Sequence, residues 1–115
     1  MSTSTRTLRV GARIYRTRVR HEHEAGPCAE VLTFRSDLPR SAPLRIVFRA
    51  GADRGVGDGW PSGHVALRGA ALNLHRPRVA RALLDEALAR GWDEVTGQEL
   101  DGWTLFDAAR ARMAS

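Results

Sequence analysis

The residues best suited to chemistry lie in the stretch His21-Glu22-His23-Glu24 and at Cys28, the only cysteine. Two histidines two positions apart point the same way on a strand, so they could supply two ligands to a metal ion. A structural zinc site needs four ligands. Cys28, His64 and His75 would have to reach it from three separate segments, and no C-x-x-C or H-x-x-x-H spacing is present. We therefore predict that the protein has no metal site and needs no cofactor.

A nucleophilic or acid–base site is the next possibility. His64 lies close in sequence to Ser62 and Asp58, but all three fall in one expected loop without the strand–turn–helix context of a nucleophile elbow. Cys28 follows Pro27 in another expected loop, and a cysteine without an identified activating environment is usually inert. We predict no catalytic residues and a protein that is not an enzyme. A small hydrolase-like enzyme is kept as the third functional alternative.

Residues 51–63 hold five of the 11 glycines and predict a long loop. Glycine backbone N–H groups can approach a phosphate closely, yet neither the P-loop pattern nor G-x-G-x-x-G occurs here. Trp60 lies within this loop. A large exposed aromatic side chain is costly unless a partner covers it, and tryptophan is enriched among the residues that dominate binding energy. Trp60 is therefore a candidate for binding a protein partner.

Arginine gives the chain its positive charge. All 18 basic residues are arginine, and residues 1–55 contain 11 of them against 5 acidic residues. Arginines at alternate positions of a strand share one face, and planar guanidinium groups suit phosphate or carboxylate. The binding candidates on this predicted face are Arg16, Arg18, Arg20, Arg45 and Arg49.

A nucleic-acid partner would normally also need aromatic side chains for base stacking. The aromatic residues of the same strands, Tyr15, Phe34 and Phe48, fall on the opposite, apolar face. Glu22 and Glu24 continue the outward face of the arginine strand and would partly neutralise it. The predicted face is either a solvated strand face or a surface for an acidic or nucleic-acid partner, and the missing stacking residues place protein binding above nucleic acid.

The spacing of apolar residues predicts both strands and helices. Pro77 fits a first helical position and Gly91 fits a left-handed C-terminal cap, while Asp101 can cap a second helix. Strands are expected over residues 6–10, 14–19, 30–35, 44–49, 64–67 and 71–74. The fold class is α+β: an antiparallel sheet of four to five strands packed by one main helix (about 77–90) and a shorter C-terminal helix (about 101–113).

A chain of 115 residues has the length of one domain, and we expect a disordered N-terminus (1–5) followed by a single domain (6–115). No apolar run approaches the roughly 20 residues of a membrane span, and the first ten residues lack the apolar core of a signal peptide. One cysteine allows no internal disulfide. We expect a cytoplasmic protein that does not associate with membranes.

Function follows by elimination. The first hypothesis is a small non-catalytic protein–protein interaction module, such as an accessory subunit or neutralising partner of a larger bacterial-type assembly. The alternative is a nucleic-acid-binding accessory domain that uses the arginine face. Steep salt dependence would favour the nucleic acid, whereas mild salt dependence and sensitivity to Trp60→Ala would favour a protein partner.

Overall fold

The computed structural model describes residues 4–23, 27–56 and 62–114. Five strands form the main sheet, in the spatial order β1-β2-β3-β4-β8. Neighbouring strands are antiparallel except for β4 and β8, which are parallel. These strands are β1 (Ser4–Val10), β2 (Arg13–Glu22), β3 (Ala29–Ser36), β4 (Leu44–Arg49) and β8 (Gln98–Asp101).

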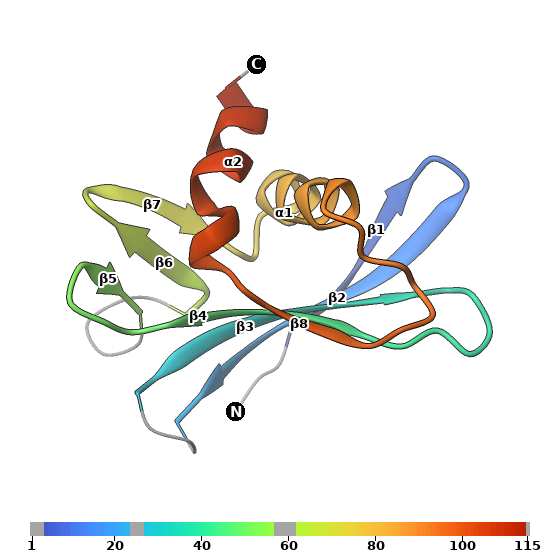
Figure 1. Cartoon of the computed structure of the whole chain (residues 1–115), viewed down its shortest axis with the longest axis horizontal. Coiled ribbons are helices and arrows are strands. Elements are labelled where there is room, and N and C mark those ends of the chain that lie inside the picture. The colour runs from blue at the N-terminus through green and yellow to red at the C-terminus, as the bar shows by residue number, and fades with distance from the viewer. Residues whose placement is uncertain (1–3, 24–26, 57–61, 115) are drawn as a thin grey trace.

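A second, three-stranded sheet stands at one end of the first (Figure 1). It consists of β5 (Arg54–Gly55), β6 (His64–Leu67) and β7 (Ala70–Asn73), all antiparallel. The turn between β6 and β7 uses Arg68 and Gly69, both with positive φ, which matches the strand twist in a two-residue hairpin. Val65, Leu67 and Leu72 are buried in the same core as the residues of the main sheet.

Both helices, α1 (Pro77–Ala89) and α2 (Trp103–Ala114), lie on one side of the main sheet (Figure 1). Helix α1 starts at Pro77 and is followed by Gly91, whose φ is 99°, so its ends are those that the sequence predicts. Its inner stripe, including Leu83 and Leu84, packs in one core cluster with Leu44, Ile46 and Phe48 of β4. Neither α1 nor α2 covers the opposite face of the sheet.

The predicted fold class is confirmed: the chain is α+β, with a mostly antiparallel main sheet and two helices. Two features differ from the sequence-based expectation. The 64–67 and 70–73 hairpin belongs to a separate sheet, and the fifth strand of the main sheet is β8, which the sequence did not predict. In addition, residues 4 and 5, which were expected to belong to a disordered N-terminus, are part of β1.

Asp101, predicted to cap the second helix, is the last residue of β8 and lies two residues before Trp103, the first residue of α2. Its carboxylate still accepts the backbone N–H of Trp103 at 3.0 Å, as expected of a residue that begins a helix. Gly102 connects β8 to α2 and lies against Phe48, whose ring a Cβ there would approach to 2.5 Å. Within the described ranges, neither helix is long and apolar enough to cross a membrane.

Candidate functional site

The face of the main sheet that the helices leave open carries all five arginines predicted to point outward, together with Arg35. We call this set the arginine face: Arg16, Arg18, Arg20, Arg35, Arg45 and Arg49. Strand β3 lies between β2 and β4 and pairs with both. The arginines of β2 and β4 therefore share a face across one intervening strand, although the two strands are not direct neighbours.

Arg45 is the one member of this face that is held between carboxylates of the described residues. Its guanidinium donates to Glu22 at 3.3 Å and to Glu99 at 3.2 Å. The hydrogen bond to Glu22, and secondarily that to Glu99, raises the pKa of Arg45 above its ordinary value against the opposing effect of partial burial. The positive charge of Arg45 is thus already balanced by two carboxylates, and its hydrogen bonds connect β2, β4 and β8.

Arg16, Arg18 and Arg20 are exposed and make no ion pair with any residue that the structure describes. They follow one another along β2 at intervals of about 7 Å, the repeat of alternate strand residues. Arg16 lies directly opposite Arg35 of β3, and among the described residues Arg35 donates only to the carbonyl of Ser41. Like charges in directly opposed positions destabilise a sheet, so an anion bound here would relieve that repulsion.

A shallow depression of about 430 Å³ lies over these arginines. Its lining includes Arg16, Arg18, Arg20, Arg35, Arg45, Thr5, Thr33 and Pro43. The lining therefore combines cationic side chains with hydroxyl groups that can donate hydrogen bonds. Such a surface is suited to carboxylate or phosphate oxygens.

Small apolar residues form the floor of the arginine face beside this depression. Ala29, Val31 and Val47 are buried in a cluster of their own, separate from the main core. Long arginine side chains can lay their methylene stems over apolar neighbours while the guanidinium stays in water. Arg20 is directly opposite Val31 across the β2–β3 pair, which places its stem where it can do so.

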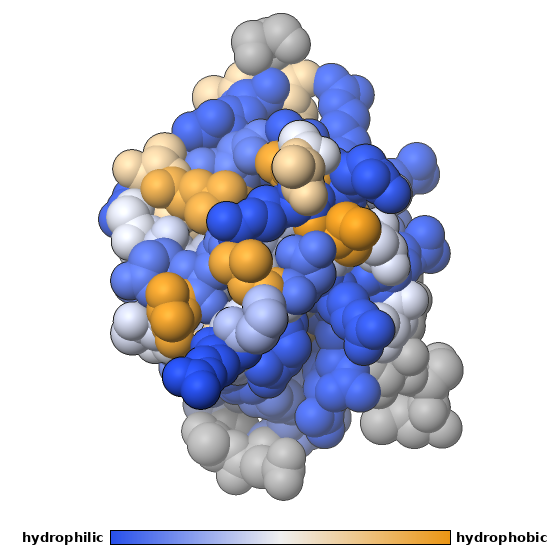
Figure 2. All heavy atoms as spheres, turned by 90° about the vertical axis from the view of Figure 1, so that its right-hand side faces the viewer, coloured by the Kyte–Doolittle hydropathy of each residue, from blue (hydrophilic) through white to orange (hydrophobic). Residues whose placement is uncertain are grey.

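No large apolar patch accompanies this charge on the parts of the surface that the structure describes. The exposed large hydrophobic residues there are Leu38 and Val95. Figure 2 shows one side of the molecule, on which hydrophobic residues form separate spots within a hydrophilic surface. Charge and hydrogen bonding, rather than apolar area, distinguish the arginine face.

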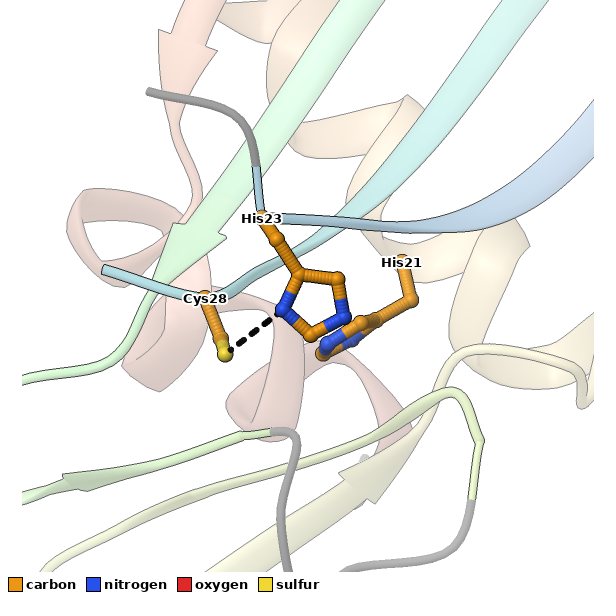
Figure 3. A group of neighbouring side chains, drawn as sticks. All are labelled: His21, His23 and Cys28. Atoms are coloured by element: carbon orange, nitrogen blue, oxygen red, sulfur yellow. Dashed lines mark hydrogen bonds between the residues drawn. The ribbon is translucent and has the colours of Figure 1, made fainter. Parts of the chain in front are cut away.

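A second group of polar residues lies where β2 ends and β3 begins. Ligand atoms of His21, His23 and Cys28 all lie within 4.8 Å of one another. The Cys28 sulfur is 3.2 Å from Nδ1 of His23, and the rings of His21 and His23 meet edge to face with centroids 4.3 Å apart (Figure 3). The antiparallel pairing of β2 with β3 brings the three together, because His21 and Cys28 stand near the ends of adjacent strands.

Glu30 supports this cluster from the interior. Its side chain is 2% exposed, and its two carboxylate oxygens contact Nδ1 of His21 and the backbone N–H of Gly63, the latter at 2.9 Å. Gly63 has a φ of 79°, and a Cβ there would lie 2.4 Å from the His75 ring. The carboxylate thus links the main sheet to the start of β6 at a position that suits glycine alone.

Of the residues considered for a triad, the structure describes Ser62 and His64, and their side chains do not hydrogen-bond to each other. The Ser62 hydroxyl is 3.4 Å from Nε2 of His75, whereas Nδ1 of His64 lies 3.3 Å from the Ser62 carbonyl. Asp58 and Trp60 lie outside the described residues, as do Gly57 and Gly59 of the glycine-rich segment. Glu24 also lies outside them.

Two residues that matter to these sites were missed from the sequence. Arg35 alternates with the apolar residues of β3 in the same manner as the arginines of β2, so the signal was present. Glu30 was counted only as an acidic residue, because nothing in the sequence places a glutamate at the start of a strand inside the molecule.

No family model matches the chain, and neither a curated protein nor a solved structure matches it.

Proposed function

We propose that the protein is a small non-catalytic binding module that docks an acidic surface of another protein on its arginine face. The observation that carries this proposal is the row Arg16, Arg18 and Arg20, exposed and without ion-pair partners among the described residues, with Arg35 opposed to Arg16. Carboxylates of a partner would neutralise this row through paired, forked hydrogen bonds. Such a module can serve as an accessory subunit or as a neutralising partner.

Three features favour a protein partner over a nucleic acid. The arginine face bears no aromatic side chain among the described strand residues, so it offers no platform for bases. Glu99 and Asp101 of β8 share this face, and Glu22 ends the β2 row, so these carboxylates would repel a phosphate backbone that crossed the whole sheet. The mixed charge is instead suited to a protein surface with carboxylates opposite β2 and basic groups opposite β8.

A nucleic-acid backbone is the second candidate, and the row along β2 is the observation that favours it. Three arginines in line with a fourth beside them could neutralise successive phosphates without reading sequence. The duplex would then lie over β1–β3 and avoid the acidic residues of β8.

The experiment for the proposed function compares which proteins the wild type and two matched triple variants capture from a nuclease-treated extract of the native host. One variant replaces Arg16, Arg18 and Arg20 with Ala. The control replaces Arg76, Arg81 and Arg110, which are exposed residues in or beside the helices, and so has the same net charge. We expect a specific protein that the wild type and the control retain and the β2 variant loses. Retention of the same proteins by all three would contradict the proposal.

Titration of labelled single- and double-stranded oligonucleotides separates the second candidate. If Arg16, Arg18, Arg20 and Arg35 each neutralise one phosphate of duplex DNA, log K falls against log salt with a slope of about −3 to −4. The β2 triple variant would flatten that slope by about three units, and the helix control would leave it unchanged. Absence of binding at low salt would exclude nucleic acid as the partner.

A further inference from the structure

The cluster at the start of β3 carries an inference that does not depend on the proposed function. Three side chains with metal-binding atoms, His21, His23 and Cys28, converge from the two ends of one strand connection (Figure 3). His21 and Cys28 are partly buried, whereas His23 is exposed. The sequence argument against a metal rested on the spacing of these residues along the chain, and the pairing of β2 with β3 overcomes that spacing.

One separation within the cluster is close to that between two ligands of one zinc ion. Zinc bonds thiolate sulfur at about 2.3 Å and imidazole nitrogen at about 2.0–2.1 Å, in tetrahedral geometry. Sulfur and nitrogen atoms bound to the same ion are therefore about 3.5 Å apart. The separation between the Cys28 sulfur and Nδ1 of His23 is 3.2 Å, and all three ligand atoms lie within 4.8 Å of one another, so rotation of the side chains would bring them to one ion.

Glu30 supplies the support that metal-bound histidines usually have. A ligating histidine normally gives its second ring nitrogen to a carboxylate, carbonyl or water, which fixes the ring orientation and tautomer. Nδ1 of His21 contacts the buried Glu30 carboxylate, and this leaves Nε2 for the ion. The backbone N–H of Gly63 holds the other carboxylate oxygen, so Glu30 itself is fixed in place.

The same contacts argue against a catalytic cysteine–histidine pair. In such a pair the base that contacts the sulfur is oriented by a third group. Here the carboxylate orients His21, whereas the histidine in contact with Cys28 is His23, which is exposed. His21 and His23 thus lie near the Cys28 thiol without contacting it in series, which is the arrangement of metal ligands rather than of a catalytic triad.

We propose that His21, His23 and Cys28 bind one zinc ion, with Glu30 positioning His21. The three side chains leave one tetrahedral position for water or another ligand. The ion would join the end of β2 to the beginning of β3 beside the second sheet.

Cobalt(II) is the first probe, because a thiolate bound to it produces a charge-transfer absorption that zinc lacks. Metal-free, reduced wild-type protein is titrated with Co²⁺, and Zn²⁺ is then added to displace it. We expect one equivalent to bind with the thiolate absorption and with tetrahedral visible bands, and stoichiometric Zn²⁺ to remove both. A wild-type protein without the thiolate absorption at saturating Co²⁺ would overturn the proposal, whatever the variants do.

Variants then locate the site. Cys28→Ser should abolish the charge-transfer absorption, and His21→Ala and His23→Ala should each weaken Zn²⁺ binding at least as much as Glu30→Gln, for which about 10- to 100-fold is expected. His64→Ala is the control, since that histidine contacts the Ser62 carbonyl, and it should leave the affinity unchanged. Equal weakening by His64→Ala and His23→Ala would contradict the assignment. Circular dichroism of each metal-free variant checks that it is folded.

Discussion

The two faces of the main sheet are built from alternate residues of the same strands, yet they are buried by different means. On the covered face, Ile46 and Phe48 pack against the helices and the second sheet. On the open face, Val31 and Val47 are 1% and 3% exposed although neither α1 nor α2 covers them. Arginine stems such as that of Arg20, which is directly opposite Val31, are placed where they can cover these valines. Apolar packing stabilises one face, whereas the other keeps its charged groups available for binding.

The covered face should therefore be the more sensitive to loss of side-chain volume. Leu84→Ala removes a side chain of α1 that is fully buried against β4, and it should cost about 2–5 kcal/mol of unfolding free energy through lost transfer energy and a cavity. Urea unfolding measures this. Leu38→Ala is the control, because Leu38 is exposed in the β3–β4 loop. An equal effect of the two substitutions would mean that α1 does not pack on the sheet through Leu84.

The open face should show an intermediate effect if arginine stems bury its valines. Val47→Ala removes two methyl groups from a buried position, and it should cost about 1–2 kcal/mol at about 0.8 kcal/mol per buried carbon. Val95→Ala removes the same groups at a position that is 68% exposed. If Val47→Ala were as harmless as Val95→Ala in urea unfolding, the arginines would not cover the valines.

Charged groups of the open face should contribute least to stability. Arg45→Ala breaks the contacts with Glu22 and Glu99, but the arginine is more than a third exposed, so the loss should not exceed about 1 kcal/mol. Arg16→Ala should have no cost or a small gain, because it removes the repulsion from Arg35. Unfolding at low and high salt measures both. A large loss from Arg16→Ala would assign that residue to the fold rather than to binding.

Much of the fold could be predicted from local signals. Proline and glycine mark the ends of α1, and strict alternation reveals the strands and the outward direction of Arg16, Arg18 and Arg20. The strand β8 was missed because Gln98–Asp101 has no β-branched or aromatic residue. It forms through parallel pairing with β4, a long-range contact that leaves no local trace in the sequence.

The histidine–cysteine cluster was considered from the sequence but rejected as a metal site, for a related reason. Its residues are close in sequence, but their convergence depends on the register of β2 with β3, which pairs His21 with Glu30. Only that register places the carboxylate behind His21. Spacing along the chain therefore predicted the direction of single side chains well, and the grouping of side chains from different strands poorly.

Arginine-selective modification of the wild-type protein tests most directly whether the arginine face is a binding surface. Phenylglyoxal labelling is measured residue by residue, by mass spectrometry, in buffer and in nuclease-treated native extract. We predict that Arg16, Arg18 and Arg20 are protected in the extract, while Arg76, Arg81 and Arg110 are labelled equally in both. Equal labelling of all six residues in buffer and extract would contradict the account.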